Sequence, residues 1–251
     1  MKQVKDTSKG LRRKRELEKN LKFHLNFIEQ KLSDKDLISA LNKCESALTL
    51  IKENQKLGLK DYFNKFTAIS NLINQKISEL RKLYENELEK MRRSKITQDN
   101  LEEVLKKYVN IKNQIAQEKG QSLLEDLNQN IDLNLEFIKK SYGLIGIYDI
   151  LNYDNVIEST YSLIWKAKSE NLTNFRRFFE EMQNNLIKLR INEIGTSVEK
   201  ISIFELSDKC LVDEYQLEPI VREMVKDENS LVKVFVENPK MVVFKKGENQ
   251  Q

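Results

Sequence analysis

The segment from Leu59 to about Arg93 contains neither glycine nor proline, the residues that most often interrupt a helix. At about 1.5 Å per residue, it predicts a single helix about 50 Å long. Apolar side chains recur along it at a spacing near 3.5 residues: Tyr62, Phe66, Ile69, Ile73, Leu80, Tyr84 and Met91. This spacing is typical of a helix that packs along a partner helix. A coiled-coil homodimer through Leu59–Met91 is therefore one hypothesis, which an exposed stripe would favour and a covered stripe would not.

The whole chain is poor in the same two residues, with seven glycines and two prolines among 251 residues. Hydrophobic residues make up 39% of the sequence and charged residues 33%. This composition predicts long helices around a core and argues against wholesale disorder. Before Leu59, two apolar stripes flank the helix-cap signal Ser33-Asp34-Lys35-Asp36, and they predict an antiparallel helical hairpin.

Aromatic residues concentrate in the second half of the chain. A strongly apolar helix face is predicted at Phe175, Phe178, Phe179, Met182, Leu186 and Leu189. Trp165, on the preceding helix, is predicted to be a core residue. Gly143 and Gly146 stand among dense apolar residues and suggest a buried junction between helices.

The last part of the chain has the pattern of a small winged helix. A helical stripe over Glu214–Lys226 places its apolar residues at i, i+3, i+4, i+7 and i+8. Two short apolar strands, Leu231–Val236 and Met241–Lys245, follow it around Asn238-Pro239. We therefore expect a mainly α fold, in which long helical hairpins or a helical array precede a C-terminal winged helix with a two- or three-stranded β wing.

The outward face of the recognition helix balances acids against bases: Gln216, Glu218, Arg222, Glu223, Lys226 and Asp227. A helix that enters the major groove normally offers excess positive charge to the phosphates. Docking of a protein is therefore favoured over reading of DNA.

In the wing, alternation predicts that Val232, Val234 and Val236 face the core, while Lys233 and Phe235 point outward. Because strand edges pair readily with another sheet, the wing is the candidate docking surface. The candidate partner-binding residues are Phe235, Lys233, Val242 and Phe244.

The apolar pattern of the winged helix comes after a helical array and a long aromatic-rich helix. It consists of Leu217 and the runs 200–209, 220–225, 234–236 and 241–244. This order resembles the PCI domain, whose members are scaffold subunits of the proteasome lid and of translation initiation factor three. The resemblance covers about 197–246 and is architectural over 120–196. It implies a non-catalytic assembly role with protein subunits of a larger complex as partners. Similar winged helices occur in ESCRT-II subunits and in scaffolds of the ufmylation ligase.

These patterns predict five segments along the chain. They are a basic N-terminal arm at 1–22, elongated helical hairpins at 23–118, an aromatic-rich helical subdomain at 119–196, the winged helix at 197–246 and a disordered tail at 247–251.

The basic arm supports an alternative function. Residues 1–22 carry nine basic and three acidic residues, a net charge of +6, whereas the whole chain carries +4. The arm is either a solvated helix end or a contact with nucleic acid, an acidic partner or an anionic surface. In the nucleic-acid alternative, the contact residues are Arg12, Arg13, Lys14, Arg15, Lys240, Lys245 and Lys246.

The sequence offers few residues for catalysis or metal binding. It has one histidine, His24, and two distant cysteines, Cys44 and Cys210, with no phosphate loop or Cys-x-x-Cys motif. We therefore expect no enzyme activity, no cofactor and no metal site. Reduced cysteines fit the cytoplasm. No apolar run approaches the length that spans a bilayer.

Overall fold

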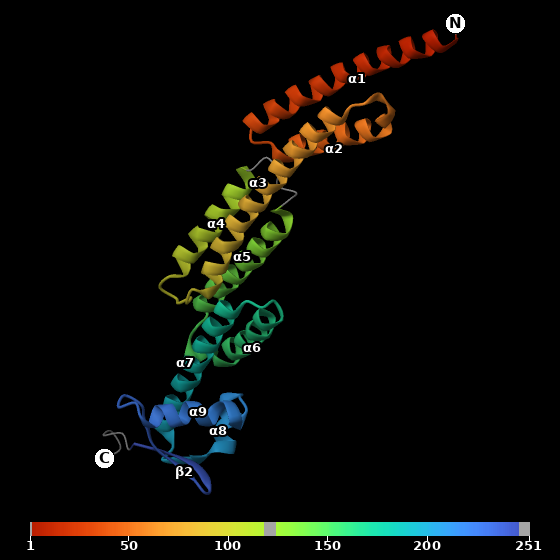
Figure 1. The fold of residues 1–251 in the computed structure, drawn as a ribbon. Coiled ribbons are helices and arrows are strands. Elements are labelled where there is room, and N and C mark those ends of the chain that lie inside the picture. The colour runs from red at the N-terminus through yellow and green to blue at the C-terminus, as the bar shows by residue number, and fades with distance from the viewer. Residues whose placement is uncertain (1, 118–123, 246–251) are drawn as a thin grey trace. The chain divides into compact units, whose positions relative to one another are not determined.

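The computed structural model describes residues 2–117 and 124–245, with side chains described from residue 10 onward (Figure 1). The chain forms two compact units. The first comprises Met1–Lys90 and Lys106–Leu133, and the second comprises Met91–Leu105 and Asn134–Gln251. Residues 134–196 of the predicted helical subdomain share the second unit with the predicted winged helix, whereas residues 124–133 belong to the first unit.

The first unit begins with a helical hairpin. α1 (Lys2–Ser33) packs against α2 (Leu37–Glu53), as the cap signal predicted. The carboxylate of Asp36 accepts a hydrogen bond from the backbone N–H of Ser39 at 3.1 Å and so caps α2. The predicted arm is not separate from this hairpin, because α1 runs without interruption from Lys2 to Ser33.

After the short 3-10 helix η1 (Gln55–Leu57), the predicted long helix is confirmed as α3 (Lys60–Arg93). Its apolar stripe is covered by residues of the same chain. Phe66 and Ile73 are fully buried in a cluster with α1 and α2, and Tyr62 packs partly buried against it. The face that we considered for a coiled-coil homodimer is thus occupied within one chain.

Two further helices follow, α4 (Leu101–Gln117) and α5 (Glu125–Gly146). The apolar stripe of α4 is buried at Leu101, Val104, Tyr108, Ile111 and Ile115. In the first unit, Arg81 pairs with Asp126, and Lys112 pairs with Asp132. The hydrogen bonds from Arg81 hold the pKa of Asp126 below its usual value.

The second unit contains the aromatic core. It includes the 3-10 helix η3 (Ile150–Asn152), α6 (Tyr153–Ser169) and α7 (Thr173–Ser197). The ring of Phe137 on α5 lies 5.5 Å from Phe175 and 6.3 Å from Phe179, both on α7. The prediction that Trp165 is a core residue was wrong. It lies on α6 with 68% of its surface exposed.

The C-terminal part of this unit has the element order of a winged helix. β1 (Lys200–Ser202), α8 (Ile203–Cys210) and α9 (Glu214–Val225) precede β2 (Val232–Glu237) and β3 (Lys240–Phe244). The three strands form an antiparallel sheet in the order β1-β3-β2. The predicted stripe of α9 is buried at Leu217, Ile220, Val221 and Met224. The predicted mainly α fold with a C-terminal wing is therefore confirmed.

Specific contacts attach the winged helix to α6 and α7. The hydroxyl of Tyr153 donates to the carbonyl of Cys210 at 2.5 Å. Gly195 on α7 lies so close to the ring of Phe244 that a Cβ at this position would overlap it. A chain of hydrogen bonds also joins Tyr161, Gln216, Gln183 and Thr160.

Candidate partner-binding surfaces

The sheet of the winged helix has a free edge at β2. In the described part of the chain, β2 pairs only with β3, so its other edge keeps backbone donors and acceptors for a further strand. Val234 is 43% exposed and Val236 37% exposed. An unpaired strand with exposed valines is suited to pairing with a strand of another protein.

The predicted alternation along β2 was wrong at Val234, Val236 and Phe235. A register shift between Val232 and Val234 interrupts the ladder, and such a bulge changes which residues face the core. Only Val232 is buried. Phe235 pairs across the sheet with the buried Val242 and is half-buried.

Two of the four candidate partner-binding residues belong to the core. Val242 is fully buried, and Phe244 is 3% exposed beneath α7. Their side chains are therefore not at a surface that a partner could touch. Alternation along the strand alone could not distinguish these core residues from surface residues. Lys233 is exposed, as expected.

The outward face of α9 carries a network of paired charges. The Glu218 carboxylate accepts hydrogen bonds from Lys240 Nζ at 2.8 Å and from Arg222 Nη2 at 2.7 Å. These two bonds hold the pKa of Glu218 below its usual value. Arg222 also lies 3.0 Å from Glu237, and its guanidinium stacks 4.8 Å from the ring centre of Phe235. The network thus joins α9 to β2 and β3 and neutralises the positive charges of Arg222 and Lys240.

The lysines assigned to nucleic-acid contact in the wing have other partners or are not described. Lys240 pairs with Glu218, and Lys245 donates from Nζ to the carbonyl of Glu228 at 2.9 Å. Lys246 lies outside the described residues. The candidate arm residues lie on α1 in the other unit, where Arg12, Arg13 and Arg15 are exposed and Lys14 is partly buried.

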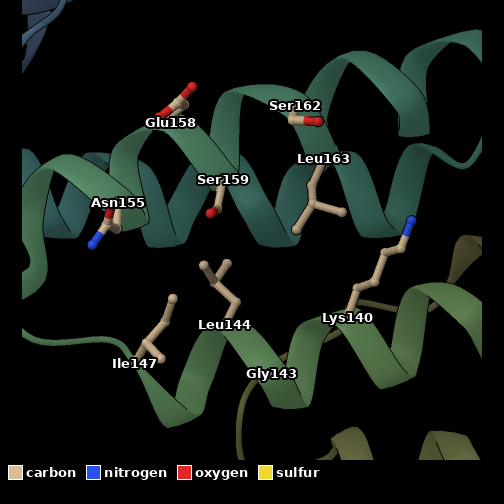
Figure 2. A pocket seen from close by; sticks show the side chains of 9 residues that line it. All are labelled: Lys140, Gly143, Leu144, Ile147, Asn155, Glu158, Ser159, Ser162 and Leu163. Atoms are coloured by element: carbon tan, nitrogen blue, oxygen red, sulfur yellow. The ribbon is translucent and has the colours of Figure 1, made fainter.

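A second candidate surface is a groove between α5 and α6, with a volume of about 590 Å³ (Figure 2). Leu144 on α5 and Ile147, directly after its end, point toward Ser159 and Leu163 on α6. A junction between helices follows Gly146, where α5 ends, but the prediction that it is buried was wrong, because Gly143 and Gly146 are both exposed. Since a Cβ at Gly143 would meet nothing within 4 Å, this wall leaves room for the side chains of a partner helix.

One end of the groove is held by ion pairs. Glu136 accepts hydrogen bonds from Lys140 at 2.7 Å and from Lys166 at 2.9 Å, and these bonds lower its pKa to about 2. Glu158, on the α6 wall, is exposed and has no ion pair within the described ranges. The groove therefore combines apolar side chains with one carboxylate that a basic partner residue could meet. The spacing of residues along a single helix could not predict this groove, because two helices form its walls.

The described residues offer no constellation typical of catalysis. His24 is 8% exposed, and burial, together with the charge of Lys43, lowers its pKa. Burial raises the pKa of Cys44 to about 11 and that of Cys210 to about 12, so neither thiol is a good nucleophile. No three His, Cys, Asp or Glu side chains in the described part converge as a metal site would require.

Over residues 2–117 and 124–245, none of the helices has both the length and the apolar character that a membrane span requires. No protein-family model matches the chain, and no curated protein matches its sequence.

Proposed function

We propose that the protein is a non-catalytic scaffold or adaptor subunit of a multiprotein complex. The observation that carries this proposal is the unpaired edge of β2, which presents Val234 and Val236 beside a charge-neutral α9 face. The resemblance of residues 197–246 to the PCI domain implies the same role. The proposal places the protein in the cytoplasm, where its two buried cysteines would remain reduced.

Protein docking suits this winged helix better than DNA reading does. A DNA-reading helix needs free cationic groups for the phosphates, yet Arg222 and Lys240 both bind Glu218. Bringing Glu218 to a phosphate backbone would add repulsion. A strand of a partner, in contrast, would satisfy the outer backbone groups of β2 without disturbing these ion pairs.

The α5–α6 groove supplies a second docking surface for a helix of a partner. Its walls contribute residues at helical spacing, such as Lys140 and Leu144 on α5 and Ile147 directly after its end. An amphipathic helix whose apolar face carries one basic residue opposite Glu158 would complement it.

The test is purification of the full-length tagged protein from its native cells, with nuclease treatment, followed by mass spectrometry. We expect stoichiometric protein partners that survive nuclease. A Val234→Lys/Val236→Lys variant should lose the partner that pairs with β2, because lysines at exposed edge positions oppose strand addition. Both valines are exposed, so this variant should keep its fold.

A matched control replaces two exposed leucines on α3 with the same residue, Leu72→Lys/Leu83→Lys. This control should retain every partner. A partner set that is unchanged by the β2 variant would show that the strand edge is not an interface. The absence of any stoichiometric partner would refute the scaffold role.

A further inference from the structure

The outer face of α1 carries a row of exposed basic residues. Arg12, Arg15, Lys19 and Lys22 stand at i, i+3, i+7 and i+10, so a single face of the helix presents all four. The row is about 15 Å long. The opposite face of the same helix is buried against the hairpin core at Leu21, Leu25 and Ile28.

The charges of this row are largely without partners. Arg12 lies 3.5 Å from Glu16, but both side chains are well exposed, so the pair is weak. Within the described residues, no carboxylate pairs with Arg15, Lys19 or Lys22. The row therefore remains a concentrated positive potential, unlike the α9 face.

An aromatic platform continues the row. Phe23 follows at i+11 from Arg12 and is 62% exposed, which is unusual for a phenylalanine. Phe27 is one helical turn further on and half-buried. The Nζ of Lys43 on α2 lies 5.9 Å from the ring centre of Phe23 and 5.4 Å from that of Phe27. Two rings and a fifth cationic group, that of Lys43, thus extend the basic row to about 22 Å.

We infer that this outer face of α1, from Arg12 to Phe27, binds single-stranded nucleic acid. The four basic side chains of the row would contact successive phosphates, and Phe23 would stack on a base beside Lys43. A cationic track next to exposed aromatic rings is the arrangement by which proteins bind single strands without reading their sequence. Four phosphates lie at the lower end of the usual size of such sites.

Single strands fit this face better than the two other polyanions. The bases of a duplex are already stacked on one another, so a duplex would leave Phe23 without a contact. An acidic protein surface would neutralise the basic row but has no flat ring system for Phe23. RNA and DNA single strands share the phosphates and bases that this face contacts.

The first test measures binding of labelled oligo(U), about 12 nucleotides long, to the full-length protein over a series of salt concentrations. Four phosphate contacts predict a slope of about −2.8 in log affinity against log salt. Arg15→Gln/Lys19→Gln should weaken binding about tenfold and make the slope shallower by about 1.4. Glutamine preserves the helix, which circular dichroism can verify.

The matched control makes the same charge change on an exposed face of α3, with Lys82→Gln/Lys90→Gln. We expect its affinity and slope to equal those of the unmodified protein. An equal loss in this control would show only a general charge effect and would overturn the site. Absence of oligo(U) and oligo(dT) binding at low salt would overturn it too.

The second test separates stacking from charge. Phe23→Ala should weaken oligo(U) binding about tenfold without changing the salt slope, because it removes a base contact and no phosphate contact. If Phe23→Ala has no effect, or if duplex DNA or polyglutamate binds as tightly as oligo(U), the face serves another polyanion and the proposal fails. A preference for oligo(U) or for oligo(dT) would show whether the site prefers ribose or deoxyribose strands, and either result would support the site.

Discussion

The outward faces of α1 and α9 are both rich in charged residues, yet they differ in where the opposite charges lie. On α9, Glu218 stands between Arg222, one turn along the helix, and Lys240 from β3, so cations and anions cancel. On α1, among the side chains described from residue 10 onward, Glu16 is the one acid paired with the basic row, in a weak and exposed contact. From this comparison we expect the placement of acids, and not the number of bases alone, to decide whether a helix can attract a polyanion.

The largest expected effect tests the difference in burial between the wing and α1. Val242→Asp should lower the free energy of unfolding of the second unit by about 3–5 kcal/mol, because it leaves a buried charge without a partner. Leu11→Asp on α1, where the leucine is 59% exposed, should change stability by less than about 0.5 kcal/mol. Urea denaturation monitored by circular dichroism measures both. Equal losses would contradict the assignment of Val242 to the core.

A smaller effect should follow from changing the charge pattern of α9 to that of α1. Glu218→Lys removes the shared carboxylate and leaves three cations, residue 218, Arg222 and Lys240, on neighbouring positions. In a background in which Arg15 and Lys19 are changed to glutamine, it should restore salt-dependent oligo(U) binding about tenfold. Anisotropy titration measures the gain. No gain would mean that ion pairing is not what separates the two faces.

The smallest effect sharpens the electrostatics of α9. Lys240→Gln removes one of the two hydrogen-bonded cations, so the pKa of the Glu218 carboxyl should rise toward its ordinary value. Because the folded-state pKa is depressed, the favourable pairing is present above the ordinary pKa and is lost as pH falls through the folded value. Titration of the carboxyl carbon by NMR reports the shift. An unchanged pKa would show that Lys240 does not hold Glu218 in solution.

The features set by one element alone could be predicted from the sequence. The long helix α3, the hairpin of α1 and α2, and the buried stripe of α9 each follow from the periodicity of a single segment.

The features that depend on two elements could not be predicted. The bulge at Val232/Val234 is a property of the β2–β3 pairing, so alternation along β2 placed Val234 and Phe235 on the wrong faces. Trp165 is hydrophobic enough for a core, but which side of α6 meets α7 is set by tertiary packing. The aromatic platform was missed because Lys43 comes from α2, although Phe23 and Phe27 stand at i and i+4 on α1.

The hydrogen-bonded chain from Tyr161 through Gln216 and Gln183 to Thr160 has a consequence for how the second unit responds to damage. Gln183 and Thr160 are buried, so separating α9 from α6 and α7 would break both hydrogen bonds of Gln216 and open this buried side-chain network to water. Opening of the winged helix and opening of the α6–α7 pair should therefore be a single cooperative event, with similar amide exchange rates in both. A fragment cut near Gly195 would keep Gln216 but lose both of its partners, Tyr161 and Gln183, so the winged helix should not be transferable to another protein as an independent module.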